Sequence, residues 1–556
     1  MEKIKLKING QEVEGKMGET IMSVALKNKI NILGVCYCPD LKPESSCRLC
    51  LVSIVNRKGF FTSCNTKIEQ GMEVITDSPE IEKIKRINFE LIFSKHSQNC
   101  FSCRRKKYCK LLKIARVYGF DLKSIKKTRL LEKYQFGPSI IFDPNKCINC
   151  NNCVQVCHNQ GVGFLETKKV DGFSRVTPSC NSKDCIYCGQ CLSHCPSGAF
   201  EEVSSIPNVE QILADKQNYV VFQFSSVMVK SLKGELGNDW DINFLSKALK
   251  KMGAKMIFDT SFGVDVVIEE ESKDLIHRLG EKNKQCLFTS HCPAWVKFIE
   301  FYYPEFIPSL SNNRSPHMIW GGHIKNYLIK QGIDPAKIFI ISIAPCTSKK
   351  YEVLRPELEI GGIRPVDAIL TTNEVCLLLR KLNYNLGEIE KENLKNVFIK
   401  NKDAYGSNED IIKSGLKAFY KKKTGKELNG QEFKKIEGVE NGIESDVLID
   451  GKLVKVAVVY GLLGAKKILE ILKNNPNAYD YLEVMACPRG CLGGGGQPIY
   501  DDASIDDCLI EKDMNGYFDV VQIEKIIDAG LEKRKEICKT EYSKAIKNNK
   551  KAPTDR

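Results

Sequence analysis

The sequence lacks the long apolar segments that would carry a chain into or across a membrane. No run of about 18 apolar residues occurs in its 556 residues, so we expect no transmembrane helix. The opening residues, MEKIKLKINGQEVEG, alternate charged and apolar side chains and contain no apolar core of a signal peptide. These absences predict a cytoplasmic protein that works without a membrane partner.

Recognition motifs for nucleotides and nucleic acids are also missing. No G-x-G-x-x-G fingerprint follows a predicted strand, so the chain is not expected to oxidise NAD(P)H by itself. No nucleic-acid-binding motif accompanies the formal net charge of +14. A solvated basic surface is one explanation of this charge, and a surface that attracts an acidic partner is another. Basic stretches at 104–107 and 125–129 are candidates for such a surface.

Cysteine, in contrast, is abundant, with 25 residues. A secreted protein would use them in disulfides, whereas a protein of a reducing compartment uses them as metal ligands. The opening segment favours the second use. Nineteen of the cysteines fall into five groups, and the other six are interpreted as small apolar residues: Cys38, Cys180, Cys286, Cys376, Cys508 and Cys538.

The first cysteine group has the spacing C-x10-C-x2-C-x13-C. Its members are Cys36, Cys47, Cys50 and Cys64. A close pair between two distant partners is typical of a loop that wraps a [2Fe–2S] cluster. A predicted hairpin over residues 2–15 with an Asn-Gly turn, followed by a helix over 20–28, favours a β-grasp domain. A structural zinc site is the alternative, although zinc usually takes two close pairs, and Cys38 competes with Cys36 as a ligand.

The second group contains a histidine and has the spacing H-x3-C-x2-C-x5-C. Its members are His96, Cys100, Cys103 and Cys109. An imidazole in place of one thiolate removes a negative charge and raises the reduction potential of a cluster. Zinc bound by three cysteines and one histidine is the chemical alternative. The spacing resembles the His-ligated [4Fe–4S] segment that follows the [2Fe–2S] domain in hydrogenases and in the large redox subunit of respiratory complex I.

The third and fourth groups repeat the spacing C-x2-C-x2-C-x3-C, which denotes a ferredoxin module with two [4Fe–4S] clusters. The first run is Cys147, Cys150, Cys153 and Cys157, and the second is Cys185, Cys188, Cys191 and Cys195. The fourth cysteine of each run ligates the other cluster in such modules, so we expect Cys157 to join the second run and Cys195 the first. His158 stands where proline is usual. Four clusters in series predict an electron path that ends at a catalyst.

The chain changes character after about Pro207, where predicted strands alternate with amphipathic segments. Buried strands are predicted at 218–224, 338–344, 453–459 and 481–484, and an amphipathic segment at 461–473. This pattern favours an α/β domain. The last four grouped cysteines lie in TSHCPAW, APCTSKKYE and EVMACPRGCLGGGGQP, at Cys292, Cys346, Cys487 and Cys491. Two of these stretches directly follow a strand, where α/β sheets place their sites, and the Gly493–Gly496 run would let a bulky ligand approach.

These three stretches resemble the three sequence motifs of [FeFe]-hydrogenases, and the order of the N-terminal cluster groups matches that family along the whole chain. The resemblance implies an α+β multidomain chain: a β-grasp [2Fe–2S] domain, a His-ligated cluster segment, a ferredoxin domain with two [4Fe–4S] clusters, and a large two-lobed α/β H-cluster domain. The predicted boundaries are 1–78, 79–126, 127–207 and 208–556, the last with a basic tail expected to be disordered.

The resemblance also implies the cofactors: one [2Fe–2S] cluster, three accessory [4Fe–4S] clusters and an H-cluster. The four motif cysteines would hold the [4Fe–4S] part, and Cys491 would bridge to a two-iron unit with CO, cyanide and azadithiolate ligands. Lys349 would donate to one cyanide, and the pocket residues would be Pro293, Ser315, Met485 and Glu352. Protons would pass through His291, Ser311, Glu271 and Asp274.

Each of these roles has a plainer alternative. Lys349 would otherwise be a surface charge, Met485 a core residue, and the acidic pair Glu271 and Asp274 part of a solvated helix start. Two histidines depart from the family pattern. His291 stands where a proton-relaying cysteine is usual, and His317 where glutamine is usual. Because histidine titrates near neutral pH, it can relay protons, and we expect an altered pH dependence.

The expected function is the reversible reaction of H2 to two protons and two electrons, with ferredoxin as the electron partner and maturation proteins supplying the H-cluster. A low-turnover H2 or redox sensor on the same fold is the first alternative, although sensors usually append a signalling domain. An electron-transfer subunit would lack the last four grouped cysteines, and a related iron–sulfur assembly protein tends to lose the surroundings of the second motif. Here Lys349 and Glu352 are present.

Overall fold

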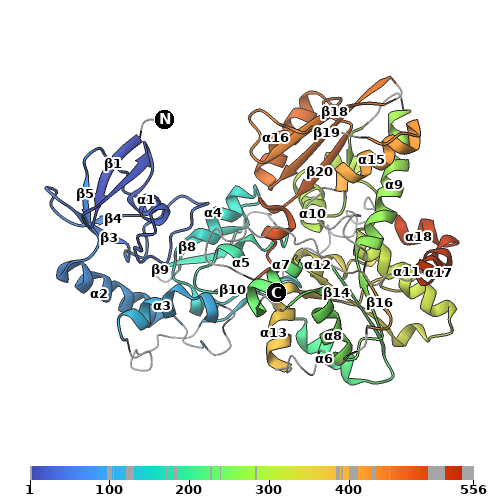
Figure 1. The fold of residues 1–556 in the computed structure, drawn as a ribbon, viewed down its shortest axis with the longest axis horizontal. Coiled ribbons are helices and arrows are strands. Elements are labelled where there is room, and N and C mark those ends of the chain that lie inside the picture. The colour runs from blue at the N-terminus through green and yellow to red at the C-terminus, as the bar shows by residue number, and fades with distance from the viewer. Residues whose placement is uncertain are drawn as a thin grey trace.

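The structure, a computed structural model, places four successive regions along one molecule. It describes residues 3–96, 100, 103, 105–120, 131–170, 173–179, 184–225, 228–237, 240–281, 285–382, 389, 392, 394–399, 411–428, 432–449, 451–498 and 520–540. Figure 1 shows the N-terminal sheet at one end of the long axis and the two large sheets of the C-terminal region at the other. None of the helices in these ranges has the length and apolar character needed to cross a bilayer.

The first region (residues 3–78) contains the predicted β-grasp elements. Its strands are β1 (Lys3–Ile8), β2 (Gln11–Lys16), β3 (Leu51–Ile54), β4 (Phe61–Thr62) and β5 (Glu73–Ile75), in the order β2-β1-β5-β3-β4. β1 and β2 pair antiparallel, and the turn residues Asn9 and Gly10 have φ of 51° and 79°, as an Asn-Gly hairpin requires. Helix α1 (Ile21–Lys27) begins at Thr20, whose side chain accepts a hydrogen bond from Ser23 N. The predicted hairpin and helix are both confirmed.

A helical segment follows and leads toward the second cysteine group. It contains α2 (Pro79–Lys95), η1 (Lys106–Tyr108) and α3 (Lys110–Val117). Phe89 stacks on Phe93 and Phe120, with ring centroids 5.4 and 4.7 Å apart. These rings hold α2 against the chain that follows α3. The contact brings His96, at the end of α2, toward the part of the chain that carries Cys109.

The dicluster region (residues 131–205 as far as described) has an internal repeat. It contains β6 (Tyr134–Phe136), β7 (Ile140–Phe142), η2 (Pro144–Lys146), α4 (Asn152–Asn159), β8 (Leu165–Val170), β9 (Phe173–Pro178), α5 (Gln190–His194) and β10 (Phe200–Glu202). Each cysteine run enters its helix through a left-handed residue, Asn151 at φ 67° and Gly189 at φ 72°. The sharp turn lets three cysteines of a run face one point.

The C-terminal region (residues 206–540 as far as described) is built on two sheets. The first is fully parallel, in the order β15-β14-β11-β12-β16, with β11 (Tyr219–Phe224), β12 (Met256–Asp259), β14 (Ile338–Ala344), β15 (Ala368–Thr371) and β16 (Val397–Phe398). The second has the order β13-β20-β19-β18-β17, with β13 (Leu287–Phe288), β17 (Lys434–Lys435), β18 (Gly442–Ile449), β19 (Lys452–Tyr460) and β20 (Tyr481–Met485). The predicted strand at 338–344 has the bounds of β14, and the other three differ by one or two residues.

Helices join the two sheets into one two-lobed body, as predicted. They are α6 (Ile206–Ala214), α7 (Met228–Leu236), α8 (Ile242–Met252), α9 (Ser261–Leu279), α10 (Pro293–Tyr302), η3 (Pro304–Ser309), α11 (Pro316–Lys330), η4 (Pro335–Lys337), α12 (Ser348–Glu352), η5 (Pro356–Leu358), α13 (Thr372–Leu382), α15 (Ile411–Thr424), α16 (Leu462–Asn474) and η7 (Gly490–Gly493). One hydrophobic core runs from Phe258 in the first sheet through Trp320 and Trp295 to Leu482 in the second. This shared core fixes the lobes relative to each other.

Two further helices come from the part of the chain that carried no recognisable sequence signal. α17 (Val520–Leu531) and α18 (Arg534–Cys538) pack on α11 and α9, beside each other in Figure 1. Arg314 donates to the carbonyl of Ile537 at 3.1 Å, and Arg534 to Glu270 at 2.9 Å. Residues 520–540 are therefore part of the packed C-terminal region. The lysine-rich end lies outside the described residues.

Candidate metal centres and active site

The first cysteine group is arranged as two facing pairs of buried thiols. Cys36 Sγ and Cys47 Sγ are 3.3 Å apart. A hydrogen bond joins the Cys50 and Cys64 thiols. This bond has the largest effect on the pKa of Cys50 and raises that pKa. Cys38 is not part of this arrangement, since it lies beside Asp40 and His194. The geometry favours Cys36 over Cys38 as the fourth ligand of a [2Fe–2S] cluster, and the ligand set stays a prediction.

His96 of the second group is oriented like a metal ligand. Its Nδ1 lies 3.0 Å from the carbonyl of Lys146 and donates to it, because a carbonyl only accepts. That bond leaves Nε2 with a lone pair, the usual arrangement of a ligating histidine. Burial lowers the pKa of His96 and so favours the neutral ring. Burial raises the pKa of Cys109, and the Cys103 and Cys100 thiols add to the effect.

The two runs of the dicluster region exchange their last cysteines. After burial, the Cys195 thiol is the main group that raises the pKa of Cys150. In the second run, the pKa of Cys188 is raised by burial and then by the thiols of Cys185, from the same run, and Cys157, from the first run. Backbone N–H groups point at these sulfurs, with Ala199 N 3.2 Å from Cys195 Sγ. This grouping supports the predicted crossover, and the assignment of ligands to clusters remains a proposal.

The dicluster region docks directly on the C-terminal region. Gln190 Nε2 donates to the carbonyl of Gly493 at 2.9 Å, Thr347 Oγ1 to that of Tyr187 at 2.8 Å, and Ser348 Oγ to that of Ile186 at 3.1 Å. The second cysteine run therefore touches the second and third motifs. The Cys346 thiol is close enough to raise the pKa of Cys188.

The four motif cysteines converge from three loops. Cys292 precedes α10, Cys346 follows β14, and Cys487 and Cys491 follow β20. Burial raises the pKa of Cys346 to about 11, and the Cys292 thiol adds to the effect. Burial, with those same two thiols, raises the pKa of Cys491 to about 12, although Cys491 keeps accessible surface. Thiols whose pKa is raised in this way become thiolates only beside a strong positive charge, so they fit an iron–sulfur cluster.

The glycine run of the third motif lies close to the backbone of other segments. A Cβ at Gly494 would stand 2.3 Å from the carbonyl oxygen of Pro345, and a Cβ at Gly495 would stand 2.5 Å from Gly189 Cα. Gly494 and Gly495 therefore admit protein backbone at close range. They let the third motif, the second motif and the dicluster region approach one another closely.

Lys349 and Glu352 belong to one buried network beside these cysteines. Lys349 Nζ donates to Glu352 Oε2 at 2.7 Å and to the carbonyl of His291 at 3.1 Å. His317 Nε2 also donates to Glu352 Oε2, at 2.7 Å. Burial raises the pKa of Glu352, but Lys349 and His317 outweigh it and hold the pKa at about 2. The Lys349 side chain is largely buried, and its ammonium group is held by both Glu352 and the His291 carbonyl. Lys349 is therefore not an ordinary surface charge.

Several buried polar atoms at the start of α11 and in the third motif have no hydrogen-bond partner in the part of the chain that the structure describes. Among the described residues, no partner exists for Ser315 Oγ, His317 Nδ1 or the side-chain amide of Gln497. Buried polar atoms are normally hydrogen-bonded, so each calls for a ligand group. Pro293 begins α10 and Met485 ends β20, so both flank the cysteines. These atoms and thiols fit a cluster that carries polar ligands.

The candidate proton relay begins next to Cys292. His291 Nε2 lies 3.3 Å from Glu271 Oε1, and Tyr481 Oη donates to the other oxygen of that carboxylate. Burial lowers the pKa of His291, but the Glu271 carboxylate outweighs it, so the pKa lies above its usual value. Glu271 is 1% exposed and lies in the middle of α9. The alternative of a solvated helix start is therefore wrong for Glu271.

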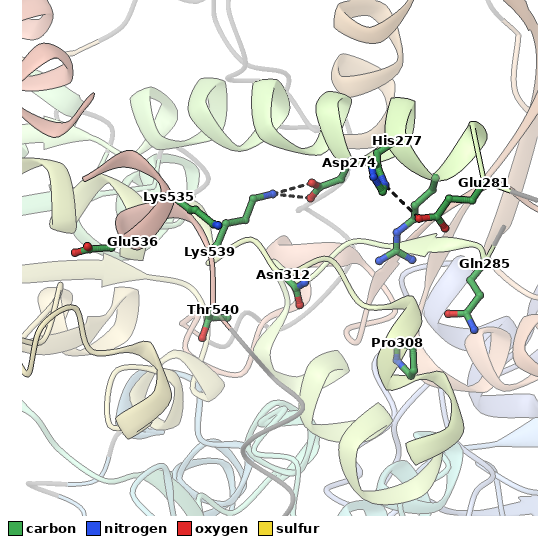
Figure 2. Close-up of a pocket in the computed structure, with 11 residues that line it drawn as sticks. Asp274, His277, Glu281, Gln285, Pro308, Asn312, Lys535, Glu536, Lys539 and Thr540 are labelled. Carbon is green, nitrogen blue, oxygen red and sulfur yellow. Dashed lines mark hydrogen bonds and ion pairs between the residues drawn. The ribbon is translucent and has the colours of Figure 1, made fainter. Parts of the chain in front are cut away.

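The other two predicted proton-relay residues, Ser311 and Asp274, form a separate group that reaches the surface. Asn313 Nδ2 donates to Ser311 Oγ at 2.9 Å and to Asp274 Oδ2 at 3.1 Å, which links these two predicted residues. Lys539 Nζ binds both Asp274 oxygens, at 2.8 and 2.7 Å. Figure 2 shows this ion pair at the wall of an open pocket of about 720 Å³.

Three residues that contact these predicted side chains were not predicted from the sequence. Asn313, Lys539 and Tyr481 carried no motif or spacing signal, and Lys539 is 265 positions away from Asp274 in the chain. Only the fold brings them together. Of the two basic stretches considered for docking, residues 125–129 and position 104 lie outside the described residues.

Taken together, these features define an iron–sulfur oxidoreductase in which successive cluster sites lead to a buried catalytic centre. Residues 218–495 match the family described as iron only hydrogenase large subunit, C-terminal domain. Residues 1–79 match a 2Fe-2S iron-sulfur cluster binding domain, and residues 146–199 match a 4Fe-4S dicluster domain. The chain belongs to the [FeFe]-hydrogenase family, whose reaction is the oxidation or production of H2.

Individual relatives match the sequence over most of the chain. It is 30% identical to the NADP-reducing hydrogenase subunit HndD of Solidesulfovibrio fructosivorans, covering 90% of this chain and 89% of the relative. It is 28% identical to iron hydrogenase 1 of Clostridium pasteurianum, covering 91% and 90%. The fold is similar to that of a variant of apo [FeFe]-hydrogenase HydA1 from Chlamydomonas reinhardtii, with a TM-score of 0.53 and 25% identity over 61% of this chain and 98% of that one.

Proposed function

We propose that this chain is a ferredoxin-linked hydrogenase that catalyses the reversible conversion of H2 to two protons and two electrons. The observation that carries the proposal is the convergence of Cys292, Cys346, Cys487 and Cys491 beside Cys188 of the dicluster region. Heterolytic H2 chemistry is what the H-cluster supplies when it is bound at these thiols. One [2Fe–2S] and three further [4Fe–4S] clusters would connect it to the electron partner.

The chain's own side chains would manage charge and protons at this centre. Lys349, held by Glu352 at 2.7 Å, would present an ammonium donor to a cyanide ligand. Ser315 Oγ and His317 Nδ1 would satisfy further polar ligand atoms. His291 and Glu271 would pass protons between the centre and Ser311, and Asn313 would connect Ser311 to Asp274.

The choice of electron partner rests on separate observations. The relative from Solidesulfovibrio fructosivorans is named as an NADP-reducing subunit, whereas no nucleotide fingerprint of the G-x-G-x-x-G kind follows a strand in this sequence. Ferredoxin is the simplest carrier for such a chain in a reducing, cytoplasmic setting. Dedicated maturation proteins would supply the two-iron unit.

The test is to measure H2 oxidation and H2 evolution on anaerobically matured protein, with ferredoxin and with NADP⁺ as separate electron partners, and to record infrared spectra of the same sample. CO and CN bands with ferredoxin-dependent turnover would support the proposal. Absence of these bands in protein that carries its accessory clusters would refute the H-cluster assignment. Turnover with NADP⁺ alone would refute the choice of partner.

A low-turnover sensor is the second candidate, and His291 is the observation that favours it. The family usually has a proton-relaying cysteine at this position, and a slower relay would suit a sensor. CO and CN bands accompanied by almost no turnover in either direction would select the sensor over the ferredoxin-linked enzyme.

A further inference from the structure

A second kind of metal site lies where the first region meets the dicluster region. Cys38, Asp40 and His194 each offer one ligand atom, and the three atoms all lie within 4.8 Å of one another. His194 Nε2 is 3.9 Å from Asp40 Oδ2. We propose that these three side chains form a site for a divalent cation of the zinc class, separate from every iron–sulfur group.

The spacing of the three atoms is close to what such a cation needs. Zinc binds nitrogen, oxygen and sulfur at roughly 2.0–2.3 Å in a tetrahedron, so its ligand atoms stand roughly 3.3–3.8 Å apart. Because the three atoms lie within 4.8 Å of one another, the widest pair has to contract by roughly 1–1.5 Å at most, which side-chain rotation supplies. The Cys-Asp-His ligand set suits zinc and related transition metals rather than magnesium or calcium.

His194 is oriented for this role by its other nitrogen. Nδ1 lies 2.8 Å from the carbonyl of Gln190 and donates to it. The tautomer is thereby fixed, and the lone pair of Nε2 faces Asp40 and Cys38. Ligating histidines are held in the same way by a carbonyl or carboxylate on the far side of the ring.

Cys38 and Asp40 are presented together by one tight turn. Leu41 N donates to the carbonyl of Cys38 at 3.2 Å, so the two side chains project from nearby positions as a chelating pair. Cys38 is left over from the first cysteine group, because Cys36 pairs with Cys47 at 3.3 Å. The Asp40 side chain is 72% exposed, which leaves room for water as the fourth ligand.

The surrounding charges are compatible with a bound cation. Arg105 and Lys110 are the cationic side chains near the Cys38 thiol, and Asp40 is the anionic one. One thiolate and one carboxylate would together neutralise a dication. Arg105 is itself engaged, because its guanidinium donates to the carbonyl of Ser193 at 3.0 Å.

The site would tie two parts of the chain that are 154 positions apart, from Asp40 to His194. The other contacts at this seam include hydrogen bonds of exposed side chains, such as Gln155 Nε2 to Glu44 Oε1 at 2.9 Å. A bound cation would be the strongest link there. It would hold the [2Fe–2S] domain in a fixed orientation to the next cluster.

The experiment is zinc binding to the protein with all its iron–sulfur clusters in place, read by zinc X-ray absorption, which the clusters do not obscure. We expect one zinc per chain, in a shell of one sulfur with nitrogen and oxygen ligands. Cys38→Ser, Asp40→Asn and His194→Ala should each weaken zinc binding by more than about tenfold. His158→Ala, a matched exposed histidine beside another cysteine of the same region, should leave it unchanged.

Two results would overturn the proposal. One is an all-sulfur zinc shell, or zinc uptake that the three variants leave unaltered, because the metal would then occupy cluster sites. The other is loss of the [2Fe–2S] electron paramagnetic resonance signal in Cys38→Ser, because Cys38 would then be a cluster ligand. Retention of that signal together with loss of zinc supports the site.

Discussion

At the scale of single residues, His291 has the clearest consequence for turnover. Its ring lies 3.3 Å from the buried carboxylate of Glu271. We predict that His291→Ala lowers both H2 evolution and H2 oxidation by about 10²–10⁴-fold, the usual contribution of a positioned acid–base group. His291→Cys should retain most of the rate, since a thiol also relays protons.

Rates with an artificial dye as electron partner measure this effect without involving the protein partner. Infrared bands of the same samples confirm that the H-cluster is present in each variant. Full activity in His291→Ala would mean that protons reach the centre by another way.

A second residue-scale prediction concerns Lys297, a buried cation next to the dicluster region. Its Nζ lies 2.8 Å from Asp184 Oδ2 and 4.1 Å from the centre of the Tyr187 ring. Asp184 precedes Cys185, whose pKa the Lys297 charge lowers against the larger effect of burial. Lys297→Met would leave the aspartate charge uncompensated and should make the reduction potential of the adjacent cluster more negative.

The prediction is checked by a redox titration followed by electron paramagnetic resonance. Asp184→Asn should shift the potential in the positive direction, and the double variant should lie close to the unmodified protein. Lys325→Met removes another buried lysine, paired with Asp367 at 2.7 Å, and serves as the matched control. Equal shifts in both lysine variants would contradict a local effect.

At the scale of elements, residue spacing predicted the helices and strands that depend on neighbouring residues. It did not predict the packing between segments that are far apart in the chain. The Asn-Gly hairpin, the helix capped by Thr20 and strand β14 follow from adjacent residues, and all three are present. The packing of α17 and α18 on α11 was not predictable, because the contacts join residues some 200 positions apart. For the same reason Lys539 and Asn313 carried no signal, whereas the grouped cysteines did.

The contact between α11 and α17 predicts a pH dependence of stability. Burial, with Arg534 nearby, lowers the pKa of His323 from 6.5 to about 4, and a Cβ at Gly530 would stand 2.0 Å from its Nδ1. The unfolded chain therefore binds a proton that the folded chain excludes, and the free energy of unfolding falls as pH decreases from 6.5 to about 4, by roughly 3 kcal/mol in total.

This dependence is measured from thermal unfolding between about pH 4.5 and 7.5, the range over which the unfolded histidine gains its proton. His323→Gln cannot titrate, so its unfolding temperature should fall less on acidification than that of the unmodified protein. At neutral pH the two curves need not coincide. Parallel pH curves would contradict the assignment.

At the scale of the whole molecule, the order of the regions along the long axis suits an electron path with one outer end (Figure 1). The first region lies farthest from the two large sheets, and the dicluster region touches the motif loops through Gln190 and Thr347. The cysteine spacing predicted this order of cluster sites. It could not predict the docking contacts, which depend on the folded surfaces.

The proposed electron path leads to a prediction about its outer end, the [2Fe–2S] site of the first region. Cys64→Ser should remove the [2Fe–2S] cluster while the other clusters remain. Most of the ferredoxin-driven rate should then be lost, whereas a small dye, which reaches inner clusters directly, should keep its rate. Ferredoxin-driven activity that survives in this variant would show that electrons enter at another cluster, with the His96 group as the nearest candidate.

On the proposed electron path, the contact between Gly189 and Gly495 would limit how fast electrons reach the catalytic centre. A Cβ on either residue would stand less than 3 Å from the Cα of the other, so the two backbones touch where the dicluster region meets the third motif. Electron tunnelling slows steeply with each added ångström between donor and acceptor. The absence of a side chain at both positions would therefore keep the last gap narrow, and an alanine at either position would widen it while every cysteine ligand is retained.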